Sequence, residues 1–540
     1  MNGLPQKGVA KVVGVQSIEH TNKFKLNMKK NFIVLVILVV FARLNAQAAD
    51  DVLSKIRGIN LPGVTITAVE EIPAGNFTTP DGKKRTNLPA FIRVAFTSKP
   101  TSQSNIRIEL WMPKDTWNER FLGTGTGGGA GYISYDAMTG GITQGFATAN
   151  TDMGTSPGAD KIIDFPERWA DFGYRATHMM TVLSKAILNV YYERPAKYSY
   201  FEGCSTGGEQ ALMEAQRYPD DYNGIVVGAP ANNRTHLHTL FVHILNVINP
   251  DHQKAVISQS KMELLSRLLV QKYGIKSGGA PGDDFLTDPR LCHFDAESLP
   301  VCTDESNNDS CFSAAEIAVL KKLYEGPVNP RTGNRIYAPL PLGGTRIVSV
   351  LPHIYMFKWV FGKDFDYTKF DFDHDMQKMD SILGPVLNAN NPDLSAMKKR
   401  GGKILMFTGT ADQLVPAPDA INYYERVIKA QGGLKQTQSF FRFYLIPGMA
   451  HCGGGPGITE FGHKLNTMMD WVEKGIVPDK IVVTALNCCD TINRNRFQRP
   501  IFPYPKFPDY IGGNPNLPSS YTGKNHPRGA VLKPDELYLK

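Results

Sequence analysis

A serine in a tight turn flanked by glycines constrains the fold of this chain more than any other feature. The segment Gly203–Gly207 fits the pattern G-x-S-x-G, with Ser205 at its centre. Residues 198–202 before it are rich in aromatic side chains, as in a β-strand, and residues 209–217 after it are good helix formers. A strand-to-helix turn that exposes a serine hydroxyl is a nucleophile elbow. The sequence therefore predicts that Ser205 is a nucleophile.

A second match to the same pattern, at residues 154–158, lacks the features of an elbow. Pro157 has no backbone N–H to donate to an oxyanion, and it disfavours a helical conformation at Ser156. Thr206, which follows the candidate nucleophile, can donate its N–H to an oxyanion. We therefore interpret Ser156 as a loop residue.

Charge and hydropathy at the N-terminus predict export. The formal net charge is +8, but residues 1–48 hold seven Lys or Arg against one acidic residue and so account for +6 of it. The remainder carries no signal for nucleic-acid binding. Residues 28–48 combine a charged start, a short apolar run and small residues at Ala46 and Ala48. This is typical of a signal peptide, and the run is too short for a stable membrane anchor. We expect a secreted or periplasmic protein.

Export makes disulfides possible, and the chain has seven cysteines. They are Cys204, Cys292, Cys302, Cys311, Cys452, Cys488 and Cys489. An odd number leaves at least one unpaired unless it links two chains. Because no C-x-x-C pair occurs, the sequence gives little support to a zinc site, and we predict no metal site.

Strand and helix patterns alternate along the chain in the order of an α/β fold. Short apolar or β-branched runs predict strands at residues 91–96, 106–112, 146–150, 224–230, 404–407 and 441–446. We expect residues 50–232 to form the first part of a core, residues 233–398 an inserted, largely helical domain, and residues 399–540 the second part. From Arg499 the chain is rich in Pro, Gly and Asn, which predicts an irregular C-terminal tail.

A glycine-rich loop at residues 120–131 follows a predicted strand. It contains no G-x-G-x-x-G followed by a helix and an acid, and it lacks the lysine and hydroxyl of a P-loop. Such a loop can instead turn its backbone amides toward an oxyanion.

A serine nucleophile needs an imidazole to take its proton and a carboxylate to orient the imidazole. Ser205, Asp412 and His451 follow one another in the chain order of the α/β-hydrolases, each where a predicted strand ends. The alternative for Asp412 is a turn or cap residue. We interpret the other histidines as packing or surface groups, including His178, His236, His238, His243 and His353.

Cysteines adjoin two of these residues, since Cys204 precedes Ser205 and Cys452 follows His451. If the serine and the histidine are in contact, the two cysteines are close enough for a disulfide. Two free buried thiols are the alternative.

These segments resemble the Cys-Ser, Asp and His-Cys motifs of the tannase and feruloyl esterase family. The likeness covers residues 90–505 and includes residues 120–123, 149–154, 203–208, 213–219, 409–416 and 447–452. It implies an α/β-hydrolase core with a mainly parallel sheet, a lid inserted after the elbow region, and a disulfide between Cys204 and Cys452. It also implies oxyanion amides from Thr206 and Gly128, with Gly127 as the alternative to Gly128.

Many members of this family carry a calcium loop in the lid, and the corresponding residues here are 276–289. Lys276 and Gly279 stand at the first two acidic positions, which leaves Asp283, Asp284 and Asp288 beside a lysine. Calcium takes about six to eight oxygen ligands, several of them carboxylates. We therefore predict no tight calcium site and no cofactor.

The same likeness leaves Cys292 without its usual partner, so it is the candidate odd thiol. Cys302 and Cys311 could close a short loop, whereas Cys488 and Cys489 are not assigned.

The sequence thus predicts a secreted serine esterase that hydrolyses esters of hydroxycinnamic or gallic acid, small molecules of plant origin. The alternatives are a serine carboxypeptidase-like hydrolase, a hydrolase of another aromatic monoester such as a terephthalate ester, and a non-catalytic binding protein that kept the fold.

Overall fold

The computed structural model describes most of the chain. The described residues are 31, 52–252, 254–303, 308–344, 349–486 and 495–528. Apart from residue 31, the predicted signal peptide lies outside them. No helix within these ranges is both long enough and apolar enough to cross a membrane.

The chain divides into two compact units. One comprises Met1–Asn60 with Val190–Glu193, and its described part contains a short helix over residues 52–57. The other comprises Leu61–Asn189 and Arg194–Lys540 and contains all the predicted site residues.

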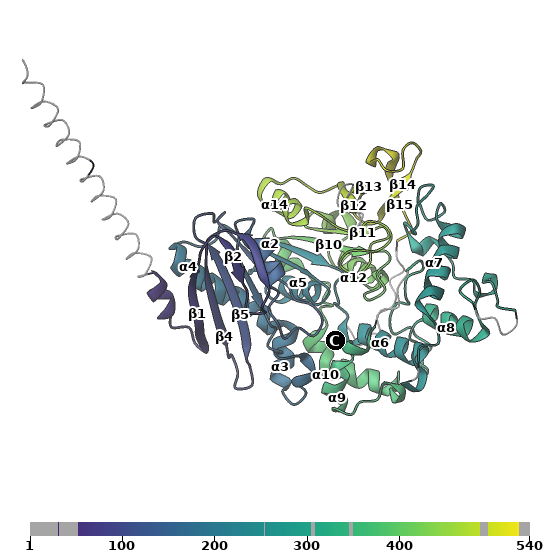
Figure 1. Ribbon diagram of the computed structural model, residues 1–540, viewed down its shortest axis with the longest axis horizontal. Helices are drawn as coiled ribbons and strands as arrows, with labels where there is room; N and C mark the ends of the chain where they lie inside the picture. Colours follow the sequence, from purple (N-terminus) through teal and green to yellow (C-terminus); the bar gives the residue numbers. More distant parts are fainter. Residues whose placement is uncertain are drawn as a thin grey trace, which may run out of the picture. The chain divides into compact units, whose positions relative to one another are not determined.

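A nine-stranded sheet forms the centre of the larger unit, as far as that unit is described (Figure 1). Its strands, in spatial order, are β1 (Val64–Ile72), β4 (Phe91–Ser98), β5 (Ile106–Pro113), β7 (Ala147–Thr151), β6 (Arg120–Thr124), β8 (Tyr198–Cys204), β9 (Gly224–Gly228), β10 (Lys403–Gly409) and β11 (Phe441–Ile446). The pairs β1–β4, β4–β5 and β5–β7 are antiparallel, and every neighbouring pair from β7 to β11 is parallel.

The parallel strands are apolar because helices and loops bury both faces of this part of the sheet. All five residues of β9 are buried, as are all residues of β10 after Lys403. The predicted α/β class with a mainly parallel sheet is confirmed.

Helices surround the sheet and fill the long segment between β9 and β10 (Figure 1). They are α2 (Tyr135–Ile142), α3 (Pro166–Ala170), α4 (Ala176–Tyr192), α5 (Thr206–Arg217), α6 (Arg234–Ile248), α7 (Gln259–Tyr273), α8 (Ala314–Glu325), α9 (Tyr355–Phe361), α10 (His374–Leu387), α11 (Ser395–Lys399), α12 (Ala417–Ala430), α13 (Leu434–Gln438) and α14 (Lys464–Lys474). Helix α5 packs on β8 and β9, whereas α14 packs on β9 and β10.

The segment from α6 to α11 coincides with the predicted insertion at residues 233–398. Its described residues add no strand to the nine-stranded sheet. That this segment is a separate lid domain stays a prediction.

The C-terminal region differs from the predicted irregular tail. Strand β12 (Ile481–Leu486) pairs with β13 (Asn495–Ile501), and β14 (Lys506–Tyr510) pairs with β15 (Tyr521–Asn525), both antiparallel. Prolines fit into β13 and β14 because each strand of a two-stranded ribbon has an open edge, where a missing N–H breaks no ladder. The prediction of an irregular tail from its Pro, Gly and Asn content was therefore wrong for residues 499–525.

Of the cysteines, Cys302 and Cys311 form a disulfide, and Cys292 is not disulfide-bonded. Cys488 and Cys489 lie outside the described residues.

The turn after β8 brings three backbone segments so close together that only glycine fits. A Cβ added at Gly203 would lie 2.5 Å from the carbonyl carbon of Gly207, and one at Gly125 would lie 2.6 Å from the Gly207 Cα. The close approach packs the loop after β6 directly against the start of α5.

We expect Gly203→Ala to lower the free energy of unfolding by about 1–3 kcal/mol or more, because backbone must move to admit the methyl group. Gly140→Ala is the matched control. A Cβ at Gly140 meets nothing within 4 Å, so we expect no loss, or a gain of about 0.5–1 kcal/mol from helix propensity. Urea unfolding measures both changes, and equal effects at the two positions would contradict the prediction.

Candidate active site

Ser205 occupies a strained turn between β8 and α5. Its φ of 65° and ψ of −121° lie in a region that residues with a Cβ rarely adopt. Two backbone hydrogen bonds hold this conformation: Ser205 N–H donates to Gly228 O at 3.0 Å, and Ala231 N–H donates to Ser205 O at 3.2 Å. The turn is therefore fastened to the end of β9, as a nucleophile elbow requires.

Asp412 lies in the loop after β10 and is fully buried. Its Oδ1 accepts hydrogen bonds from the backbone N–H groups of Leu414 and Val415, both at 2.9 Å. Its Oδ2 lies 2.8 Å from Nδ1 of His451. A proton on Nδ1 that is donated to this carboxylate leaves Nε2 as the basic nitrogen of the ring.

The loops that carry Asp412 and His451 are tied to each other. Ala411 N–H donates to Met449 O at 3.0 Å. A Cβ at Gly409 would lie 2.6 Å from the carbonyl carbon of Met449, so the two loops touch through backbone. This contact fixes the distance between the carboxylate and the imidazole.

A disulfide joins Cys204 to Cys452, with a Cα–Cα distance of 5.9 Å. Ser205 and His451 are the immediate chain neighbours of the bridged cysteines. The bridge thus links the end of the elbow strand covalently to the histidine loop. The structure therefore brings the three predicted triad residues to one end of the parallel strands.

The two predicted oxyanion donors are also brought together. Thr206 is the first residue of α5, so its N–H has no partner within the helix. The Thr206 hydroxyl donates to Gly128 O at 2.7 Å. Gly128 has a φ of +58°, which favours glycine. The neighbouring Gly127 has the hydroxyl of Tyr132 beside it, 3.3 Å from the position of an added Cβ.

Arg234, the first residue of α6, supports this loop, and the sequence analysis did not identify it. Its buried guanidinium donates to the Thr206 hydroxyl at 2.9 Å and to Gly128 O at 3.1 Å. It also pairs with Glu209 at 2.5 Å and donates to the Tyr355 hydroxyl at 2.6 Å. Burial raises the pKa of Glu209, and Arg234 opposes that shift. The sequence could not reveal this role of Arg234, because an arginine at the start of a helix is common and no local motif marks it.

His353, which the sequence predicts to be a packing or surface group, packs its ring against Phe241 with a centroid distance of 5.6 Å. Burial lowers the pKa of His353, and the positive charge of Arg234 lowers it further. His353 is therefore a neutral imidazole at neutral pH.

The sheet order and the placement of these residues define an α/β-hydrolase. Residues 92–349 and 349–523 match the sequence model described as tannase and feruloyl esterase. The chain belongs to this family, and it is a carboxylic ester hydrolase.

The relatives agree with that assignment. The chain is 33% identical to an uncharacterized esterase of Xanthomonas campestris over 91% of this chain and 94% of that protein. It is 30% identical to a probable feruloyl esterase B-2 of Aspergillus terreus over 78% of this chain and 85% of that protein.

Two solved structures resemble the fold. Feruloyl esterase B from Aspergillus oryzae has a TM-score of 0.79 and 26% identity, covering 86% of this chain and 98% of that one. Tannin acyl hydrolase from Aspergillus niger has a TM-score of 0.71 and 20% identity, covering 88% of this chain and 95% of that one, and it shows the fold alone.

The residues at the position of the family's calcium loop do not fit a calcium ion. Arg499 pairs with Asp283 at 2.7 Å, and Arg496 pairs with Asp284 at 2.6 Å. The carboxylate of Asp288 is held by Arg290 and His526, both at 2.8 Å. Each carboxylate is thus already neutralised by a cation of the chain itself.

We expect Arg234→Met to lower the free energy of unfolding by about 3–5 kcal/mol, because Glu209 would remain buried without its partner. The double variant Arg234→Met/Glu209→Gln removes the stranded charge, so it should lose less than the single variant. Denaturant unfolding of the three proteins measures this difference. A double variant that is less stable than Arg234→Met would show that the pair is not what stabilises this region.

Calcium should leave the melting temperature of metal-free protein unchanged, because no carboxylate of the 283–288 loop is available to it. A calcium titration followed by calorimetry measures this. Arg499→Gln is the informative variant, since it leaves the Asp283 carboxylate without its cationic partner. A calcium-dependent rise in the melting temperature of the unaltered protein would contradict the expectation.

Proposed function

We propose that the protein is a secreted serine carboxylesterase that hydrolyses esters of aromatic acids, of the hydroxycinnamic or gallic type. The observation that carries this proposal is the hydrogen bond from His451 to the buried Asp412, beside a disulfide that links the histidine loop to the Ser205 turn. A carboxylate, an imidazole and a serine in this order supply every group that acyl transfer needs.

In the first half of the reaction, His451 Nε2 takes the proton of the Ser205 hydroxyl as Oγ attacks the ester carbonyl carbon. The carbonyl oxygen becomes an oxyanion that accepts hydrogen bonds from the N–H groups of Thr206 and Gly128. Asp412 stabilises the imidazolium. The imidazolium then returns its proton to the departing alkoxide, which leaves as an alcohol, and the aromatic acyl group stays on Ser205.

In the second half, His451 takes a proton from water, and the resulting hydroxide attacks the acyl carbon. Collapse of the second oxyanion releases the aromatic acid and returns the proton to Ser205 Oγ. The chain therefore needs no cofactor for this chemistry.

Arg234 acts in this scheme as a positioning residue. Its guanidinium donates hydrogen bonds to Gly128 O and to the Thr206 hydroxyl. It thereby fixes the two backbone segments whose N–H groups would donate to the oxyanion. Preorganised donors need no rearrangement when charge develops, which is why such donors lower the barrier.

The aromatic acyl group is supported by two observations. A relative and a solved structure are described as feruloyl esterases. Tyr132 is 51% exposed, with its hydroxyl next to Gly127, so an aromatic face lies open beside the proposed oxyanion loop.

The proposed location is outside the cytoplasm, either secreted or periplasmic. Residues 28–48 and the two disulfides support it, since disulfides persist in oxidising compartments. The proposed partner is a small-molecule ester of plant origin, without nucleic acid or a stable membrane anchor.

Hydrolysis of methyl gallate, methyl ferulate, chlorogenate and mono-hydroxyethyl terephthalate tests the proposal. We expect turnover of at least one aromatic ester, and a loss of roughly four to six orders of magnitude in kcat for Ser205→Ala. Ser156→Ala is the matched control, because Ser156 stands in the other G-x-S-x-G segment, and it should keep full activity.

The alternatives give different results. If no ester in the panel is cleaved while a fluorophosphonate still labels Ser205, the triad stands and the aromatic-ester proposal falls. Release of C-terminal amino acids from peptides would identify a carboxypeptidase-like hydrolase, and an unlabelled Ser205 would favour a binding protein.

A further inference from the structure

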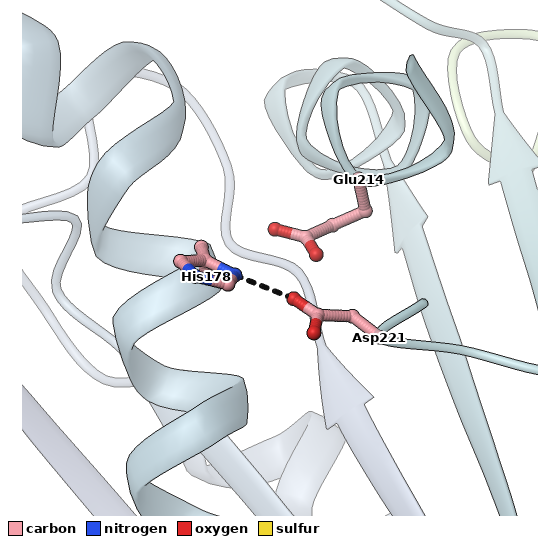
Figure 2. Close-up of side chains that lie close together, drawn as sticks. All are labelled: His178, Glu214 and Asp221. Carbon is pink, nitrogen blue, oxygen red and sulfur yellow. Dashed lines mark hydrogen bonds and ion pairs between the residues drawn. The ribbon is translucent and has the colours of Figure 1, made fainter. Parts of the chain in front are cut away.

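Three side chains that could bind a metal converge on the far half of the elbow helix, away from the proposed triad. His178 comes from α4, Glu214 from α5, and Asp221 from the segment between α5 and β9. One ligand atom from each lies within 4.8 Å of the other two. Figure 2 shows the three side chains pointing toward one another, with His178 Nδ1 hydrogen-bonded to Asp221 Oδ2 at 2.6 Å.

Glu214 gives this cluster its significance. It is 0% exposed, and neither of its carboxylate oxygens accepts a hydrogen bond from a donor in the described part of the chain. The carboxylate nevertheless points at His178 and Asp221 (Figure 2). A buried ionised group without a partner is strongly unfavourable, so native proteins pair such groups or coordinate them to a metal.

One nearby ammonium group faces the two carboxyl groups of the cluster. Lys185 donates its ammonium to the Asp221 backbone carbonyl oxygen, and its charge acts on both Asp221 and Glu214. One ammonium balances one of the two carboxylates. The His178 ring then offers a nitrogen beside two carboxyl groups, a set of groups that can bind a divalent cation.

The ring of His178 is also preoriented. Tyr218 stacks on it with a centroid distance of 3.8 Å and an interplanar angle of 9°. The His178 side chain is 29% exposed, so an ion can enter from that side and a water can complete its coordination. Fixing the plane of a ligating imidazole is a usual function of its neighbours.

We propose that His178, Glu214 and Asp221 bind a zinc ion. Zinc takes imidazole nitrogen and carboxylate oxygen as ligands, and a water as the fourth ligand would complete a tetrahedral set here. On binding, the ion takes the place of the proton between His178 Nδ1 and Asp221 Oδ2, and the imidazole stays neutral by carrying that proton on Nε2 instead.

Such an ion is structural and takes no part in ester hydrolysis. Glu214 lies about 12 Å along α5 from Thr206, at the usual rise of about 1.5 Å per residue. The ion would instead join α4, α5 and the segment leading into β9, which together support the elbow. This proposal is independent of the proposed substrate.

The test uses the full chain without a polyhistidine tag, freed of metal by a chelator and titrated with zinc by calorimetry. We expect one equivalent to bind, and Glu214→Gln to weaken binding on the order of 100-fold. Cobalt added in place of zinc should give a visible absorption band from the same single site, and that band should be absent in Glu214→Gln.

His178→Ala provides a second variant on a partly exposed position, in case Glu214→Gln fails to fold. Asp470→Asn is the matched control, because it removes a carboxylate outside the cluster, and it should bind zinc as the unaltered protein does. Equal binding by the unaltered protein, Glu214→Gln and His178→Ala would overturn the proposal by placing the ion elsewhere. No binding to the unaltered protein would also overturn it and would leave a proton shared by Glu214 and Asp221.

Discussion

The close backbone contact at the Ser205 turn is the constraint on which the rest of the site depends. Gly125, Gly203 and Gly207 meet there without side chains between them, so the loop after β6 lies directly on the start of α5. That contact lets the Thr206 hydroxyl reach the Gly128 carbonyl oxygen. The strained serine, both candidate oxyanion donors and the elbow helix are therefore brought together by one packing arrangement, which the hydrogen bonds of Arg234 reinforce.

Buried charge is concentrated along the same helix. Glu209 lies in its first turn and is paired with Arg234, whereas Glu214 lies further along and accepts no hydrogen bond from a donor in the described part of the chain. Each carboxylate would be costly alone, and the chain compensates the first with a guanidinium from α6. Helix α5 thus carries two buried carboxyl groups, Glu209 and Glu214, where packing alone would favour apolar side chains. The pairing of Glu209 with Arg234 ties the position of the helix to α6.

Sequence patterns predicted the sheet, the elbow and the chemistry-bearing residues because each rests on local signals. The apolar run of β9 and the glycines around Ser205 are readable from neighbours in the chain. The role of Arg234 could not be predicted, since it depends on contacts with Gly128 and Thr206, which are distant in sequence. The hairpins after residue 480 were missed because prolines that interrupt a central strand are harmless at an open edge. The division into core and lid remains a prediction.

The bridge between Cys204 and Cys452 spans 248 residues of chain. It cannot close until nearly all of the protein has been synthesised and both thiols have met an oxidant. The covalent link between the Ser205 turn and the His451 loop therefore forms late in folding, and only in a compartment where thiols are oxidised. A chain in a reducing compartment would hold Ser205 and His451 on two segments without the covalent link between them.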